Sequence, residues 1–283
     1  MEKEFSKKLK KIEIILEKAL VEDVPEAMFP SLVEPCRDLI RRGGKRWRPL
    51  LLVLCAELAA AKKSAGAAAG IQLAYQLTPL VEFIHNASLI HDDIEDSSDT
   101  RRGSPAVHII YGVDAALNAA SWLYFQAAQC ITHVRDPSMR RELFEVYQDG
   151  VKKLHLGQAL DIAWHRDNTQ FPSVDEYWAM SKLKTGILTA LAVQTGLLTG
   201  GASKRQIKQA ASLAADAGGA FQLLDDVVNL TSGNPGKKRG DDIVEGKKSF
   251  PVLMHLEAHP EDREHIAECF RRAKQEGVES DAV

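Results

Sequence analysis

Several features that mark common protein classes are scarce in this chain of 283 residues. Only four residues are cysteines, and they are scattered, with no CxxC pair and no metal-ligand spacing: Cys36, Cys55, Cys130 and Cys269. We therefore expect reduced thiols in a cytoplasmic protein rather than a disulfide framework. The formal net charge is −3, so the chain lacks the basic excess that nucleic-acid-binding proteins carry, and we expect no nucleic-acid partner.

Long hydrophobic runs are also missing. The most apolar segment, residues 50–61, is interrupted by Glu57 and is too short to cross a bilayer. Residues 1–11 are charged and lack the apolar stretch of a signal peptide. We therefore expect neither a transmembrane segment nor a secretory signal.

Helical periodicity dominates what is present. In residues 5–20, apolar side chains recur at three- and four-residue steps, and the same interpretation predicts helices at 50–61, 71–90, 113–134, 140–164, 174–198, 204–229 and 251–257. Ser173 and Glu176 form the signature of a capping box. We see no strand alternation, GxGxxG loop or internal repeat. These patterns predict one all-α domain, residues 1–283, a bundle of about ten helices around a deep central cavity.

Two acidic runs follow apolar helical segments. They read DDIED at residues 92–96 and DDVVN at residues 225–229. Positions i and i+4 share a helix face, so Asp92 and Asp96 are stacked like charges that destabilise a helix by about 0.2–0.5 kcal/mol. Either run alone would be interpreted as a solvated helix end. Together they indicate a Mg²⁺ site, since Mg²⁺ binds one or two carboxylates plus substrate phosphates.

Short basic groups accompany the acidic runs. They are GGKRWRP at 43–49, RRG at 101–103, KTG at 184–186, KKR at 237–239 and KK at 247–248. Arginine offers phosphate a planar fork, and lysine offers a point charge. Carboxylates can approach a diphosphate only through a metal, because unit charges ~4 Å apart repel by about 4 kcal/mol. We therefore expect two diphosphates, one bound through metal and one through arginine and lysine.

The segment from Gly43 to Pro251 resembles the trans-isoprenyl diphosphate synthases, also called polyprenyl synthetases, and most closely their geranylgeranyl diphosphate synthases. The resemblance rests on seven ordered blocks: GGKRWRP at 43–49, EFIHNASLIHDD at 82–93, RRG at 101–103, GQALD at 157–161, KTG at 184–186, FQLLDD at 221–226 and DIVEGK at 242–247. It implies the isoprenoid synthase fold, a homodimer, and head-to-tail condensation of isopentenyl diphosphate with an allylic diphosphate.

The resemblance also implies a role for each matching residue. Asp92, Asp96 and Asp225 would bind Mg²⁺, three ions per site, with Asp93 and Asp226 supporting them. The allylic diphosphate would also contact Arg101, Lys184, Lys237 and Lys247, and isopentenyl diphosphate would contact Lys45, Arg48, His85 and Arg102. Thr185 and Gln222 would stabilise the allylic cation that remains once the metal-bound diphosphate leaves. Asn229 stands where many relatives have a third aspartate, and it is a poorer magnesium ligand.

Product length depends, in this family, on residues just before the first acidic run. Here Ala87 and Ser88 are small, so we expect the product channel to continue to a floor near Trp122 and Phe125. A twenty-carbon product, geranylgeranyl diphosphate, is favoured, and a longer polyprenyl diphosphate is the alternative. The chain ends at Val283, soon after Pro251, so we expect weaker closure of the rim of the site.

Two further hypotheses come from other classes of protein. A class I terpene cyclase shares the all-α architecture, but it would have no use for the isopentenyl-binding positions. A non-catalytic regulatory subunit of a synthase would be expected to lose acidic ligands, and this chain retains both acidic runs.

Overall fold

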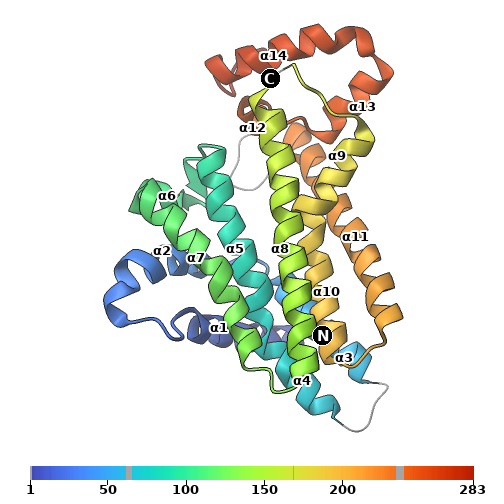
Figure 1. Ribbon diagram of the computed structural model, residues 1–283. Helices are drawn as coiled ribbons and strands as arrows, with labels where there is room; N and C mark the ends of the chain where they lie inside the picture. Colours follow the sequence, from blue (N-terminus) through green and yellow to red (C-terminus); the bar gives the residue numbers. More distant parts are fainter. Residues whose placement is uncertain (1, 62–65, 168, 234–238) are drawn as a thin grey trace. The chain divides into compact units, whose positions relative to one another are not determined.

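The structure is a computed structural model that describes residues 2–61, 66–167, 169–233 and 239–283. Within these residues it is almost entirely helical, which confirms the predicted all-α class (Figure 1). The only strands in the described ranges are β1 (Thr100–Arg101) and β2 (Ser104–Pro105). They pair antiparallel, with Thr100 opposite Pro105 and Arg101 opposite Ser104.

The chain groups into two compact units. Unit 1 consists of Met1–Val151 and Leu188–Ala214, and unit 2 consists of Lys152–Ile187 and Ala215–Val283. Three helices contribute residues to both units: α8 (Pro137–Arg166), α10 (Ile187–Thr199) and α11 (Lys204–Thr231). The expectation of one domain over residues 1–283 stays a prediction.

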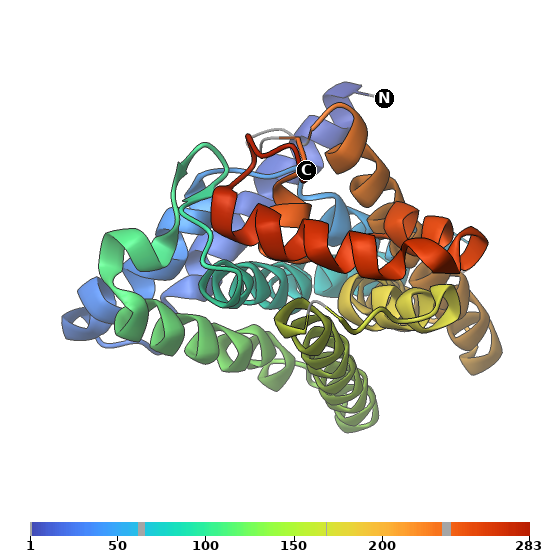
Figure 2. The ribbon, with the colours of Figure 1, turned by 90° about the horizontal axis from the view of Figure 1, so that it is seen from above.

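Unit 1 is built around α5 (Thr78–Glu95), whose residues Leu80, Phe83, Ala87 and Ile90 are fully buried. A helix that is apolar on most of its faces is stable only inside a protein, and α5 runs side by side with α7 (Val113–Thr132) in Figures 1 and 2. The other elements of this unit are α1 (Glu2–Leu20), η1 (Glu26–Met28), η2 (Phe29–Val33), α2 (Glu34–Arg41), α3 (Trp47–Ala60), α4 (Ala67–Gln76) and α6 (Val107–Tyr111).

Unit 2 is organised around a buried cluster that includes Phe171, Tyr177, Met180 and Phe270. Its further elements are α9 (Val174–Ser181), η3 (Lys182–Gly186), α12 (Asp241–Glu245), α13 (Phe250–Ala258), η4 (Pro260–Asp262) and α14 (Arg263–Glu276). The predicted capping box is confirmed. Ser173 Oγ accepts from Glu176 N at 3.2 Å, and Glu176 Oε2 accepts from Ser173 N at 2.7 Å.

One lysine is buried in the same cluster. Lys248 is 2% exposed, its Nζ donates to the carbonyl oxygen of Gly246 at 2.9 Å, and it lies 4.2 Å from the ring centroid of Phe270. Burial lowers the pKa of this ammonium to about 8. The aromatic faces of Phe270 and Phe171 compensate part of the lost hydration.

Two predicted helices are interrupted. The helix predicted at 71–90 is divided between α4 and α5 at Leu77, because Pro79 fits only the first turn of a helix. The helix predicted at 174–198 contains a π-helical segment, η3, between α9 and α10. Four α-helices, α2, α6, α12 and α14, were not predicted. Half of the α14 residues are charged, and only Phe270 and Ala273 are fully buried, with Ile266 and Ala267 packed against the same cluster.

Candidate functional site

The first acidic run lies at the C-terminal end of α5. Asp96 is the residue after the last helical one, and its N–H donates to the carbonyl oxygen of Asp92 at 2.8 Å. The expected i to i+4 relation of these two carboxylates is therefore present. Hard oxygen donors one helical turn apart are the ligand type that Mg²⁺ takes, so the residues fit the expected metal.

Asp93 differs from its neighbours, because it is fully buried. Arg101, on β1, donates from Nε to Asp93 Oδ1 at 2.7 Å, and its Nη2 lies 3.7 Å from Asp92 Oδ2. Burial raises the pKa of the Asp93 carboxyl, and the hydrogen bonds from Arg101 oppose the rise. This geometry suits a supporting role for Asp93, with its carboxylate directed at Arg101.

Four arginines lie close enough to His85 of α5 to act on its charge, namely Arg46, Arg48, Arg101 and Arg102. Burial, and then the charges of Arg48 and Arg102, lower the pKa of His85 well below its ordinary value, so the imidazole is neutral near pH 7. Burial also lowers the pKa of Arg48 to about 10. Arg48 stacks 4.4 Å from the Trp47 ring centroid, and its buried Nε has no hydrogen-bond partner among the described residues. A buried guanidinium with an unpaired donor is suited to bind an anion.

The counter-charge for this basic group is Glu82, which is 2% exposed. Arg46 Nη1 donates to Glu82 Oε1 at 2.7 Å, and Asn86 Nδ2 donates to the same oxygen at 3.0 Å. Arg102 Nη1 donates to the carbonyl oxygen of Leu39 at 3.0 Å and to that of Gly43. No role was predicted for Arg46, Glu82 or Asn86, although all three lie in quoted motifs. Lys45, which precedes α3, is exposed.

In unit 2, the predicted lysines pair with carboxylates. Lys184 Nζ donates to Asp161 Oδ2, and His165 Nε2 lies 3.0 Å from Asp161 Oδ1. Burial alone would raise the pKa of Asp161, but Lys184 and His165 hold it well below its usual range. Lys247 Nζ lies 2.6 Å from Glu245 Oε2. Asp161 belongs to the GQALD block, and the sequence had assigned it no role.

The KTG block lies in the π-helical segment η3, a type of helix defect that is frequent at functional sites. Two glycines allow the backbone to pack closely around it. A Cβ on Gly157 of α8 would lie 2.4 Å from Lys184 N, and one on Gly186 would lie 2.2 Å from Ala215 O. Glycine at these positions therefore places Lys184 and Thr185 against α8 and α11.

Thr185 and Gln222 are in contact, and the motifs alone did not predict the hydrogen bond between them. Thr185 Oγ1 donates to Gln222 Oε1 at 2.9 Å, and Gln222 Nε2 donates to Asp226 Oδ1 at 3.0 Å. Asp226 also accepts from Tyr177 Oη at 2.5 Å, and burial raises the pKa of its carboxyl to about 6. Tyr177 was missed because it lies outside every motif block.

The remaining positions of the second acidic run are less defined. Asn229 is fully buried, and neither atom of its amide has a hydrogen-bond partner among the described residues. Lys237 lies outside the described residues. In the part of the chain that the structure describes, no three His, Cys, Asp or Glu side chains are arranged to hold a metal ion.

The residues expected near the end of the product channel lie on α7. Phe125 is 75% exposed in the isolated chain, and Trp122 is half-buried. Instead, Tyr124 stacks on His91 with ring centroids 5.6 Å apart, and Ser121 Oγ lies 3.3 Å from His91 Nε2. His91 directly precedes Asp92, so these contacts place the Tyr124 ring next to the start of the first acidic run.

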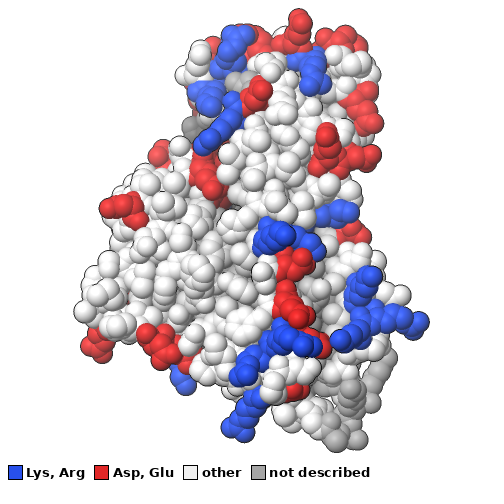
Figure 3. Space-filling model, in the orientation of Figure 1, with Lys and Arg blue, Asp and Glu red and all other residues white. Residues whose placement is uncertain are grey.

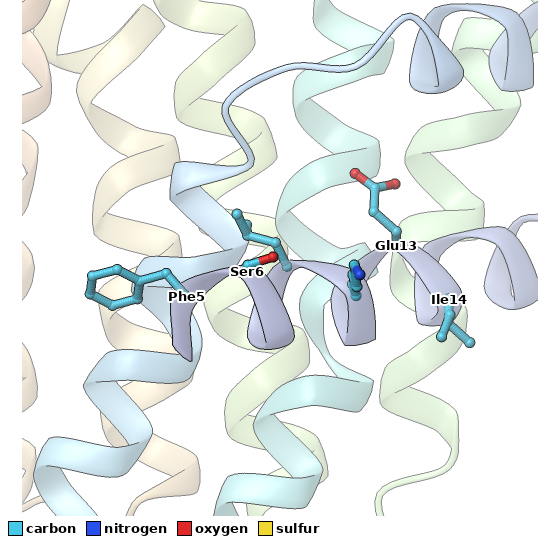
Figure 4. Close-up of a pocket in the computed structure, with 6 residues that line it drawn as sticks. Phe5, Ser6, Glu13 and Ile14 are labelled. Carbon is cyan, nitrogen blue, oxygen red and sulfur yellow. The ribbon is translucent and has the colours of Figure 1, made fainter. Parts of the chain in front are cut away.

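A separate groove lies on α1, and no predicted site residue lines it. It measures about 570 Å³ and is mainly apolar (Figure 4), and its lining is Phe5, Ser6, Leu9, Lys10, Glu13 and Ile14. It offers no cluster of charges for a diphosphate. None of the helices in the described ranges combines the length and the apolar character that crossing a membrane requires.

Comparison with known families gives one match over most of the chain. The profile of the family described as Polyprenyl synthetase covers residues 29–283. A short chain isoprenyl diphosphate synthase of Methanothermobacter thermautotrophicus is 35% identical over 263 residues, which is 91% of this chain and 77% of the relative. A geranylgeranyl pyrophosphate synthase of Macrophomina phaseolina is 38% identical over 183 residues, which is 64% of this chain and only 54% of the relative.

Solved structures give the same match. A geranylgeranyl pyrophosphate synthetase from Pyrococcus horikoshii superimposes with a TM-score of 0.82 at 32% identity, covering 95% of this chain and 80% of that one. A polyprenyl synthase from Caulobacter crescentus, complexed with calcium and isoprenyl diphosphate, superimposes with a TM-score of 0.78 at 27% identity, covering 98% and 78%.

Proposed function

This chain belongs to the polyprenyl synthetase family and is a trans-prenyltransferase, and we propose that it condenses isopentenyl diphosphate head-to-tail with an allylic diphosphate to give geranylgeranyl diphosphate. The observation that carries the proposal is the pairing of two sites on α5. Stacked carboxylates end the helix, and a buried group of arginines with a neutral histidine lies along it. One site suits a metal-bound diphosphate and the other a diphosphate held without metal.

The metal site is proposed to consist of Asp92, Asp96 and Asp225, with three Mg²⁺ ions as in the family. Mg²⁺, when bound, neutralises the allylic diphosphate and makes it a better leaving group. Asp93 and Asp226 are buried and already accept hydrogen bonds, so we assign them to hold neighbouring groups rather than the metal.

The allylic diphosphate is further held, in this proposal, by Arg101, Lys184 and Lys247, with Lys237 completing the set. Each of the first three already contacts a carboxylate, which directs its charged end. Such pre-orientation reduces the entropy that the side chain loses when the substrate binds. Thr185 and Gln222 would present oxygen atoms beside the reacting carbons and stabilise positive charge there.

Isopentenyl diphosphate is proposed to bind Lys45, Arg48, His85 and Arg102. The unpaired Nε of Arg48 supplies a donor, and neutral His85 supplies a ring N–H. Glu82 balances part of the positive charge while the substrate is absent, because it accepts from Arg46 and Asn86. The second substrate is thus held by hydrogen bonds and guanidinium charge.

We propose a homodimer, because unit 1 exposes an apolar stripe along α6 and α7. Ile109, Val113, Leu117 and Phe125 follow one another at steps of four or eight residues, and each is 46–75% exposed. The surface over these helices is largely uncharged in Figure 3. We also propose a cytoplasmic location, in keeping with four free cysteines.

The deciding experiment supplies the purified chain with Mg²⁺, isopentenyl diphosphate and allylic starters of five, ten and fifteen carbons, and then sizes the products. Consumption of isopentenyl diphosphate with accumulation at twenty carbons is expected. Products longer than twenty carbons would instead identify the enzyme as a polyprenyl diphosphate synthase. Allylic substrate consumed without isopentenyl diphosphate would indicate a terpene cyclase, and no turnover would reject prenyl transfer.

A further inference from the structure

Tyr177 ends a chain of hydrogen bonds in unit 2 that reaches the KTG block. It lies on α9 and is 5% exposed, and its Oη donates to Asp226 Oδ2 at 2.5 Å. The backbone N–H of Phe250 donates to the same oxygen at 3.0 Å. On the other carboxylate oxygen, Asp226 Oδ1 accepts from Gln222 Nε2 at 3.0 Å, and Gln222 Oε1 accepts from Thr185 Oγ1 at 2.9 Å.

The direction of every bond in this chain is fixed. A carboxylate only accepts, so Tyr177 and the amide nitrogen of Gln222 must both donate to Asp226. The amide oxygen of Gln222 therefore faces Thr185 and accepts a hydrogen bond from its hydroxyl group. The Thr185 hydroxyl can then interact with other groups only through its oxygen lone pairs. An oxygen held in this direction is suited to stabilise a developing carbocation.

Resting on the proposed prenyl transfer, we propose that Tyr177 is a positioning residue for that reaction. Its hydroxyl fixes the Asp226 carboxylate, and through Gln222 it fixes the direction of the Thr185 hydroxyl. It acts through these groups without touching the reactants. Removal of the phenol oxygen leaves Asp226 Oδ2 with the Phe250 N–H alone. The carboxylate then gains rotational freedom, and Gln222 and Thr185 lose their fixed orientation.

The competing explanation is that Tyr177 merely fills the buried cluster around Met180 and Phe270. Tyr177→Phe separates the two roles, because it keeps the buried ring and removes only the hydroxyl. We expect kcat to fall by about tenfold to hundredfold, the scale that small misplacements of catalytic groups produce. The KM for isopentenyl diphosphate is expected to change by less than about twofold, since none of its proposed ligands contacts this chain.

A double-mutant cycle with Thr185→Val measures whether the two losses in kcat are coupled, which a purely structural role of Tyr177 would not produce. If both substitutions break one chain, the doubly substituted enzyme should be no slower than Thr185→Val. Losses in kcat that multiply would overturn the proposal, because Tyr177 and Thr185 would then act independently.

Tyr147→Phe is the matched control. Tyr147 is a partly buried tyrosine of unit 1 whose Oη donates to the carbonyl oxygen of Tyr124 at 2.8 Å. This variant should retain kcat within about twofold, as expected for a residue that contacts none of the proposed ligands of metal or diphosphate. A Tyr177→Phe enzyme as active as Tyr147→Phe would also refute the positioning role.

A second measurement covers the case in which Tyr177→Phe does not fold. Incorporation of 3-fluorotyrosine at position 177 keeps the shape of the side chain and changes its strength as a donor. The proposal is supported if fluorination changes kcat in the otherwise unsubstituted enzyme but not in the Thr185→Val variant. An unchanged kcat in both enzymes overturns it. If the unsubstituted chain shows no turnover at all, prenyl transfer itself is rejected, and this proposal falls with it.

Discussion

Replacing Glu82 by glutamine isolates the charge that balances the arginine group of unit 1. Glu82 is 2% exposed and Arg46 is 5% exposed, and they lie 2.7 Å apart. Removing one partner of a buried ion pair costs about 3–5 kcal/mol, because the other charge is left without compensation. Arg46 keeps a second partner in Glu13, so we expect the free energy of unfolding to fall by about 3 kcal/mol, the lower end of that range.

The matched control is Glu13→Gln, which removes the other partner of the same arginine. Its carboxylate lies 2.7 Å from Arg46 Nε, but the Glu13 side chain is 45% exposed. A pair of this kind is worth about 0–1 kcal/mol and weakens in salt. Urea denaturation followed by circular dichroism measures both variants. Equal losses for Glu82→Gln and Glu13→Gln would refute the argument that burial, rather than charge pairing as such, makes Glu82 important.

Three further predictions concern other parts of the molecule. Gly157→Ala should lower kcat and destabilise the protein by about 1–3 kcal/mol, because the added Cβ would lie 2.4 Å from Lys184 N. Gly150→Ala on the same helix is the control, because no atom lies nearer than 3.7 Å to its added Cβ. In turnover assays and urea denaturation it should be neutral or stabilising. The pKa of Lys248 is lowered from 10.5 to about 8, so the folded state binds this proton more weakly than the unfolded state. The free energy of unfolding should therefore rise by up to about 3 kcal/mol between pH 8 and 10.5. A Lys248→Met variant that shows the same rise in urea denaturation would contradict this assignment. Phe125→Glu should shift the protein from dimer to monomer in sedimentation, because it places a charge in the exposed apolar stripe, and an unchanged dimer would exclude α7 from the interface.

The all-α class and most helix positions were predictable, because apolar periodicity is a local property of the chain. The helices predicted at 113–134, 140–164 and 204–229 correspond to α7, α8 and α11. The predicted family and prenyltransferase activity are likewise confirmed, since the motif blocks fall within the matched residues 29–283. The roles of individual site residues, the number of metal ions and the homodimer stay predictions.

What the sequence alone determined is the kind of chemistry. Paired carboxylates at i and i+4 and clustered arginines predicted a metal and anionic substrates, because charge and helical spacing follow from residue type and order. Only the tertiary structure decided which groups share hydrogen bonds. Glu82 meets Arg46 across 36 positions, and Tyr177 meets Asp226 across 49. Such contacts depend on how helices pack, and no local pattern records the partner of a buried polar side chain.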